Sequence, residues 1–279
     1  GKSTLIKLLE TTKNMPYSYN SFGYLEDLEG ITPKNLYEYY QSVLANDDVD
    51  VFVVGDVDTN QIKEYFKKYF KVNTFKKTKK DILVEELKPR KRIKKEIEQY
   101  QANQSQLTLF CTLNHLTEFE RKYVLLVYNE MLGGSSNSLL FDTVREKNSY
   151  AYYINSSAKA YDNILMIYSG IESGNSENVL KLIKKTLSDV QKGKFSDEIL
   201  ENSKATIIAS IKASTDSPNG IINTYYAKVL VNSDDFEKRM ENIKKVSRED
   251  MIELSKKVTI HTVYLLEGTG KGEENDGTN

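Results

Sequence analysis

Histidine and cysteine are scarce in this sequence, and tryptophan is absent. The 279 residues include only two histidines, His115 and His261, and one cysteine, Cys111. The zinc motifs H-E-x-x-H, H-x-x-E-H and C-x-x-C each need two such residues close together, so none of them can form within this sequence. A lone cysteine cannot make an internal disulfide and is typical of a reducing compartment. We expect Cys111 to be a half-buried thiol and His115 a surface imidazole, not a Cys-His dyad.

Long apolar runs and an excess of charge of one sign are missing as well. The longest apolar runs, such as residues 51–54, have four or five residues, whereas a membrane-spanning helix needs about 20. Lys and Arg total 39 against 40 Asp and Glu, a net charge of −1, which gives no general attraction to nucleic acid or anionic lipid. The composition predicts a globular protein of the cytoplasm, with no signal peptide and no membrane or nucleic-acid partner.

The first part of the chain carries signals for two helices and a strand. Thr32 followed by Pro33 is typical of an N-cap and a first helical residue, and apolar residues continue at helical spacing. The apolar run at 49–54 predicts a strand. Asp58 can cap a second helix, with Gln61 at its third position.

Residues 76–95 differ from their surroundings, with ten basic and three acidic residues and no apolar stripe at helical spacing. Such a stretch is typical of an extended, solvated connector. A nucleic-acid site would need interleaved aromatic residues or a known binding module, and the stretch has neither. We interpret it as a linker between two units.

The sequence after the linker predicts a larger unit of mixed strands and helices. Thr117 and Glu120 have the spacing of a capping box at the start of one of the helices. Periodicity predicts strands at 104–113, 150–158, 164–171 and 262–266, and helices at 117–131, 139–147, 176–192, 196–214, 221–231, 234–244 and 247–258. The polar residues 271–279 predict a frayed tail.

A short segment of one unit is repeated in the other. Residues 31–55 and 246–268 both read as a capped helix, a short gap, an apolar strand and a glycine, with 23 and 21 residues from cap to glycine. The second unit has about 150 residues before its copy and the first has about 30. The repeat therefore predicts the end of one half followed by all of a related half.

The stretch from Leu132 to Tyr152 combines a glycine pair, a helix and a strand that begins with tyrosines. Arg145, near the helix end, and Tyr152, early in the strand, can converge on one point. A guanidinium and a phenol there suit the binding of a peptide carbonyl or an oxyanion. Periodicity alone leaves the alternative open that Arg145 pairs with a nearby acid and Tyr152 packs in the interior.

This stretch resembles the inverzincins, the pitrilysin/insulinase-type metallopeptidases. The residues that carry the resemblance are Leu132-Gly133-Gly134, Leu140-Phe141, Val144-Arg145-Glu146-Lys147 and Ala151-Tyr152. Met15-Pro16-Tyr17, Gly23 and the block at 31–56 are similar to the end of the family's first half, so the resemblance covers about residues 15–268.

The resemblance implies an α/β (α+β type) fold of two related halves, each a mixed β-sheet covered by helices, with the first half truncated. The implied domains are 1–75, the linker 76–95, a complete second half at 96–270 and the tail 271–279. In this family the first half binds zinc through an inverted H-x-x-E-H motif, while an arginine and a tyrosine of a second half contact the substrate. Matching motif positions assigns these two roles to Arg145, for substrate orientation, and Tyr152, as oxyanion donor.

Departures from the family pattern suggest a zinc-less partner. The zinc motif is absent, Met15 replaces the usual histidine, and Ser149-Tyr150 stands where Gly-Leu is common. The resemblance implies that zinc is held by a zinc-bearing homologue, in a heterodimer or through self-association, or by upstream sequence, and that the substrate is a peptide. We expect this chain alone to be inactive. Two alternatives are a fragment of a longer zinc peptidase and a non-catalytic structural or assembly member of the family.

Overall fold

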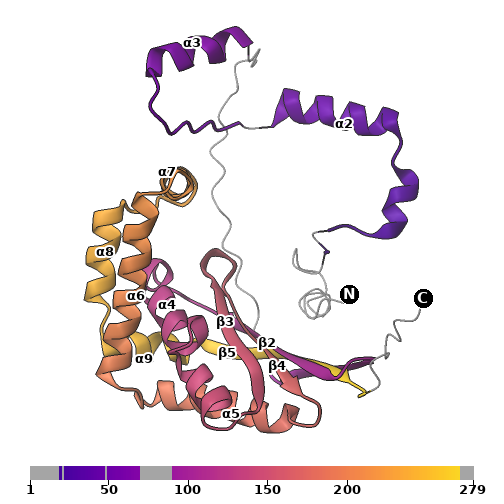
Figure 1. Cartoon of the computed structure of the whole chain (residues 1–279), viewed down its shortest axis with the longest axis vertical. Helices are drawn as coiled ribbons and strands as arrows, with labels where there is room; N and C mark the ends of the chain where they lie inside the picture. Colours follow the sequence, from indigo (N-terminus) through magenta and orange to yellow (C-terminus); the bar gives the residue numbers. More distant parts are fainter. Residues whose placement is uncertain (1–18, 21, 48, 70–89, 271–279) are drawn as a thin grey trace, which may run out of the picture. The chain divides into compact units, whose positions relative to one another are not determined.

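The computed structural model describes residues 19–20, 22–47, 49–69 and 90–270 (Figure 1). Their contacts define two units, which we call the sheet unit and the helical unit. Of the described residues, the sheet unit contains Tyr19, 90–211 and 236–270, and the helical unit contains 212–235 and those between 20 and 69. The predicted tail, the Met15-Pro16-Tyr17 motif and most of the predicted linker lie outside the described residues.

A five-stranded mixed β-sheet organises the sheet unit, in the order β1-β5-β2-β4-β3. β1 and β5 are parallel, and the other neighbours are antiparallel. The strands are β1 (Lys94–Tyr100), β2 (Gln104–Leu113), β3 (Ala151–Lys159), β4 (Ile164–Glu172) and β5 (Val258–Gly268). This sheet confirms the predicted fold class.

One face of the sheet forms the main core with the helices. Alternate residues of the central strands, such as Leu107, Leu109, Leu165 and Ile167, are fully or almost fully buried there, as expected where one strand face is covered. Figure 1 shows helices against the sheet, and contacts join α4 to β3 and α9 to β5. The α-helices of this unit are α4 (Leu125–Asn129), α5 (Ser176–Gln191), α6 (Asp197–Thr215), whose last residues belong to the helical unit, α8 (Phe236–Lys245) and α9 (Arg248–Lys256).

The predicted helix starts are confirmed by hydrogen bonds. The Thr117 N–H donates to Glu120 Oε2 at 2.7 Å, and the Glu120 N–H donates to Thr117 Oγ1 at 3.2 Å. Ser247 and Asp250 form the same reciprocal cap at α9. Several turns are π-helical, a feature that the periodicity does not predict: η3 (Glu120–Val124) and η4 (Glu130–Gly134) flank α4, and η5 (Phe141–Glu146) follows. The 3₁₀ turn η6 (Ala160–Asp162) joins β3 to β4.

The helical unit contains η2 (Leu25–Gly30), α2 (Pro33–Asn46), α3 (Thr59–Tyr69) and α7 (Pro218–Val231). The predicted caps at Thr32 and Asp58 are confirmed, because each accepts a hydrogen bond from the N–H three residues on. None of the described residues of this unit is buried. Its apolar side chains are thus half-buried or exposed.

The predicted strand at 49–54 is wrong. These residues form no strand, and no β-ladder among the described residues pairs with them. Their contact runs through side chains, since the Phe52 ring meets Tyr226 of α7 edge-on with centroids 5.6 Å apart. The second copy of the repeat, by contrast, ends in β5, an interior strand between β1 and β2.

Within the described ranges, no helix has both the length and the apolar character that crossing a bilayer demands.

Candidate functional site

The first glycine of the Leu-Gly-Gly motif lets a helix end approach the sheet closely. A Cβ atom on Gly133 would lie 2.8 Å from the backbone nitrogen of Ser156 in β3. Real Cβ atoms essentially never come within 3.0 Å of such a neighbour. Gly133 therefore allows the end of η4 to lie against β3, the strand that carries Tyr152, whereas a Cβ atom on Gly134 would meet only Glu130 and Asn129 of the same helix.

Arg145 lies in the last turn of η5 with its side chain 46% exposed. Its guanidinium carbon lies 4.7 Å from the centroid of the Phe141 ring, within cation–π range. Its Nε atom lies 4.0 Å from Glu146 Oε1, at the outer limit of an ion pair. The guanidinium is thus oriented by an aromatic ring and still has N–H donors that face solvent.

A tight turn connects Arg145 to the strand of Tyr152. The Ser149 N–H donates to the Arg145 carbonyl at 2.9 Å, and the Tyr150 N–H donates to the Val144 carbonyl at 3.1 Å. Ser149 has a φ of 53°, in the left-handed region that glycine adopts most readily. These bonds fix the backbone between the two predicted site residues.

Tyr152 projects from an irregular part of β3. The register with β4 shifts between Ala151 and Tyr153, so Tyr152 is the extra residue of a β-bulge. Ala151 and Ile154 are buried, whereas Tyr152 and Tyr153 are 49% and 39% exposed. The bulge therefore exposes two successive tyrosines, which a regular strand would direct to opposite faces.

Both predicted site residues are accessible, and neither is packed in the interior. In the described part of the chain, no hydrogen bond joins Arg145 to Tyr152. The alternative was that Arg145 pairs with a nearby acid and that Tyr152 packs in the interior. Of this alternative, the structure shows only the weak contact of Arg145 with Glu146. The roles of the two residues remain predictions.

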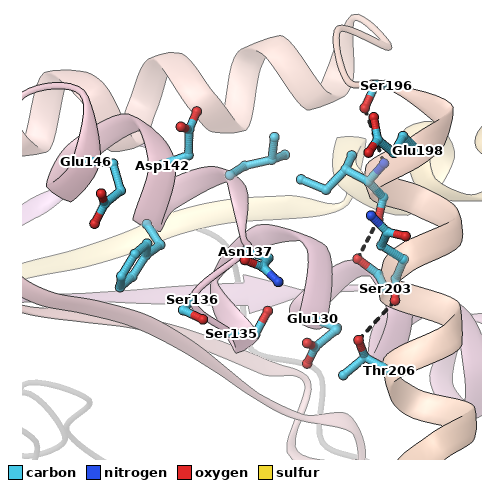
Figure 2. Close-up of a pocket in the computed structure, with 14 residues that line it drawn as sticks. Glu130, Ser135, Ser136, Asn137, Asp142, Glu146, Ser196, Glu198, Ser203 and Thr206 are labelled. Atoms are coloured by element: carbon cyan, nitrogen blue, oxygen red, sulfur yellow. Dashed lines mark hydrogen bonds between the residues drawn. The ribbon is translucent and has the colours of Figure 1, made fainter.

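An acidic cavity beside Arg145 was not predicted from the sequence (Figure 2). It has a volume of about 790 Å³ and is lined by residues of α6 and by others between 130 and 146, including Phe141, the ring under Arg145. Its carboxylates come from Glu130, Asp142, Glu146 and Glu198. Because these acids are scattered over the sequence, no local motif could have revealed the cavity. Asp142 is already paired, with Lys147 Nζ at 2.6 Å.

Cys111 and His115 do not form a nucleophilic site. Cys111 is fully buried, deeper than expected, and burial raises the pKa of its thiol to about 12. A thiol in that state is a poor nucleophile at neutral pH. His115 is exposed, as expected, at a turn after β2 with a φ of 56°.

The described residues do not fit a zinc site. Among residues 19–20, 22–47, 49–69 and 90–270, no group of three or more His, Cys, Asp or Glu side chains is placed to hold a metal ion. Zinc in a protein site takes at least three such ligands. Arg145, Tyr152 and the acidic cavity therefore supply no set of zinc ligands within the part of the chain that the structure describes.

A five-stranded mixed sheet covered by helices, with a glycine that brings a helix end against β3, agrees with the fold that the resemblance to the inverzincins implies. The family profile described as Peptidase M16 inactive domain matches residues 30–207, and the chain belongs to this family. The resemblance seen in the sequence is thereby confirmed.

Similar proteins support this assignment. The chain is 34% identical over 274 residues to the "Probable inactive metalloprotease YmfF" of Bacillus subtilis, an alignment that covers 96% of this chain and 62% of that protein. It is 29% identical over 212 residues to the "Uncharacterized zinc protease YmxG" of the same organism, covering 75% of this chain and 50% of that protein. The chain thus spans about half to two thirds of the length of these relatives.

Solved structures have the same fold. A conserved protein from Enterococcus faecalis superposes with a TM-score of 0.86 at 26% identity, over 97% of this chain and 64% of that one. A peptidase M16 inactive domain from Pseudomonas fluorescens gives a TM-score of 0.74 at 17% identity, over 97% of this chain and 66% of that one. At 17% identity, the likeness to the Pseudomonas fluorescens domain shows only that the fold is the same.

Proposed function

We propose that this chain is the zinc-less, Arg/Tyr-bearing portion or subunit of an M16-type peptidase, and that it binds the peptide substrate at a zinc site located on a partner or on upstream sequence. The observation that carries the proposal is the placement of Arg145 and Tyr152. Both are half exposed, and they flank a hydrogen-bonded turn in a domain that belongs to the inactive M16 family.

Arg145 is assigned the orientation of the peptide. Its guanidinium offers several N–H donors in a planar fork, and the stacking on Phe141 limits its conformations. Peptide carbonyls are acceptors for such donors. A fixed guanidinium lowers the entropic cost of holding an extended peptide in a reactive geometry.

Tyr152 is assigned the hydrogen bond to the developing oxyanion. A phenol is a neutral donor at physiological pH, and its ring holds the hydroxyl at a fixed distance from β3. Donors of this kind accelerate acyl transfer when they are in place before the charge develops.

The partner is proposed to be a zinc-bearing homologue, or an upstream half of the same polypeptide. One observation supports an additional domain. The chain covers only 62% of its relative in Bacillus subtilis.

A second candidate is a non-catalytic assembly member of the family. The relative YmfF is described as a probable inactive metalloprotease, which agrees with a role without turnover. In that case Arg145 and Tyr152 would affect assembly or nothing, and never peptide cleavage.

Mixing experiments test the proposal. The purified chain is assayed for zinc content and for cleavage of an unstructured peptide library, alone and after addition of zinc-bearing M16 relatives from the same organism. We expect no bound zinc and no cleavage for the chain alone, and cleavage above that of the relative alone in the mixture. Zinc bound stoichiometrically to this chain, or no gain with any zinc-bearing relative or upstream half, would reject the proposal.

A further inference from the structure

The face of the sheet that points away from the main core has its own apolar cluster. Phe110, Met166 and Tyr264 are buried there together with Ile164 and Leu266, and Tyr100 packs against them. These residues alternate along the strands with those of the main core. The second face is therefore a small apolar platform.

A groove of about 360 Å³ lies on this face, across β2, β3 and β4. Its lining residues are Gln106, Thr108, Tyr153, Ser157, Lys159, Met166, Tyr168 and Ser169. Met166 is 7% exposed, whereas Tyr168 and Tyr153 are 38% and 39% exposed. The groove thus combines a buried thioether with two accessible phenol rings, and we call it the tyrosine groove.

The position of Tyr153 depends on Gly170. The two residues are opposite each other in the β3–β4 ladder, and a Cβ atom on Gly170 would overlap the Tyr153 ring. One edge of the ring therefore lies over the glycine, and a side chain at 170 would displace the ring from this position. Burial, and then the nearby phenols of Tyr100 and Tyr168, raise the pKa of Tyr153, so its hydroxyl stays protonated as a donor.

Lys159 supplies the charge of the groove. Its side chain is exposed at the end of β3, and it has no ion-pair partner among the described residues. The lining contains no carboxylate. An uncompensated ammonium group beside aromatic rings is complementary to a ligand that carries a carboxylate next to an apolar group.

The proposed catalytic residue, Tyr152, directly precedes Tyr153 of the groove on β3. β3 is an edge strand, because it pairs only with β4 in the described sheet, and its outer backbone groups can pair with an extended chain. The bulge that exposes Tyr152 also exposes Tyr153 of the groove. A peptide strand that passes Tyr152 along β3 would therefore reach the groove.

We propose that the tyrosine groove is a specificity site for the peptide substrate, and that it takes an aromatic side chain with a carboxylate close to it in sequence. The inference rests on the proposed function and names the class of peptide. Tyr153, Tyr168 and Met166 contact the aromatic ring, and Lys159 pairs with the carboxylate. Aromatic anchors in partly buried pockets contribute most of the affinity at many peptide interfaces.

Binding of short unstructured peptides to the full chain tests the inference without any turnover. The reference peptide carries one Phe followed by one Glu, and its variants replace Phe by Ala or Glu by Gln. Isothermal titration gives the affinities, and the ¹³C-methyl signal of Met166 reports occupancy of the groove. We expect the reference peptide to shift that signal and the Phe→Ala peptide to bind about tenfold more weakly.

Variants of the chain locate the contacts. Tyr168→Ser should weaken the reference peptide about tenfold, whereas Tyr37→Ser, at a tyrosine of α2 that is 62% exposed, should leave its affinity unchanged. Lys159→Glu should remove the preference for Glu over Gln, and Lys159→Arg should keep it. The Lys159 variants change only an exposed residue. If Tyr168→Ser does not fold, they still test whether the groove binds the peptide.

The outcomes separate this inference from the proposed function. No binding of the reference peptide, an unmoved Met166 signal, or unchanged affinity in both Tyr168→Ser and Lys159→Glu would overturn the groove as a specificity site. If the groove fails while Tyr152→Phe still slows cleavage in the mixture, the proposed function stands. If peptides bind the groove but Tyr152→Phe changes no rate, the catalytic role fails and the binding site stands.

Discussion

Gly133 of η4 lies so close to Ser156 of β3 that a Cβ atom on the glycine would be 2.8 Å from the Ser156 nitrogen and 2.8 Å from its hydroxyl oxygen. Ser156 in turn donates from its hydroxyl to Asn129 Oδ1 at 3.0 Å. The Leu-Gly-Gly motif is therefore a packing device, and it fixes the strand that carries Tyr152 against the preceding helix.

Gly133→Ala should lower the free energy of unfolding by about 1–3 kcal/mol, the usual cost of overpacking a close contact. Urea denaturation followed by circular dichroism measures this change in the free energy of unfolding. Gly30→Ala is the control, since a Cβ atom there has no neighbour within 4 Å, and we expect a change of less than about 0.5 kcal/mol. Equal effects of the two substitutions would contradict the packing role.

Glu120 makes part of the stability dependent on pH. Burial raises the pKa of Glu120, but hydrogen bonds from Lys257 and Thr117 and the charge of Lys257 outweigh it, so the pKa lies below its ordinary value of 4.5. Lys257 Nζ donates to Glu120 Oε2 at 2.6 Å. Since the folded state favours the ionised carboxylate, this stabilisation is complete above pH 4.5 and is lost as the pH falls through the lower folded value.

Glu120→Gln should therefore cost about 1.5–3 kcal/mol of unfolding free energy at neutral pH, and the cost should shrink in acid. Unfolding free energies at several pH values between neutrality and pH ~3 measure this difference. Glu118→Gln is the matched control, because its pair with Lys122 is exposed on the Glu118 side. A cost that does not vary with pH would contradict the assignment.

His261 adds a second acid-sensitive contact. Arg90 Nε donates to His261 Nε2 at 2.9 Å, which requires the neutral imidazole. Burial, and then the charges of Arg90 and Lys94, lower its pKa from 6.5 to about 4. Because the folded pKa lies below the unfolded one, the neutral contact is fully stabilising above pH 6.5 and is lost as the pH falls toward 4.

At pH 5 the wild-type chain should have lost about 2 kcal/mol through this group, and His261→Gln should be free of that loss. An NMR titration of the His261 ring measures the pKa directly. A His261 pKa at or above the ordinary value would contradict the buried neutral contact.

Most of the sheet unit could be predicted from the sequence, because its elements carry local signals. Periodicity and capping residues give the positions of β2 to β5 and of the long helices to within a few residues. β1 escaped prediction because it is an edge strand with the sequence KKEIEQY. Charged residues protect such an edge from aggregation, and they also make it look like part of the basic linker.

The remaining features depend on the tertiary structure. Residues 49–54 have the composition of a strand, but a strand needs a hydrogen-bonded neighbour, and periodicity does not say whether one is present. The bulge at Tyr152 and the acidic cavity likewise depend on residues far apart in sequence. The π-helical turns are local, but apolar periodicity does not distinguish them from an α-helix. The family motif at 132–152 predicted Arg145 and Tyr152 as site residues. Tyr153, Tyr168 and Lys159 of the tyrosine groove could not be recognised in this way, because the groove forms only where β2, β3 and β4 lie side by side.

The rate of peptide cleavage by the Tyr152→Phe chain mixed with the proposed zinc-bearing partner tests the central claim most directly. Tyr37→Phe is the control, and binding of the two variants to the partner is measured in parallel. The account predicts normal assembly and a loss of about 100-fold or more in turnover for Tyr152→Phe, the usual effect of removing one oxyanion donor. Wild-type turnover by an assembled Tyr152→Phe complex would contradict it.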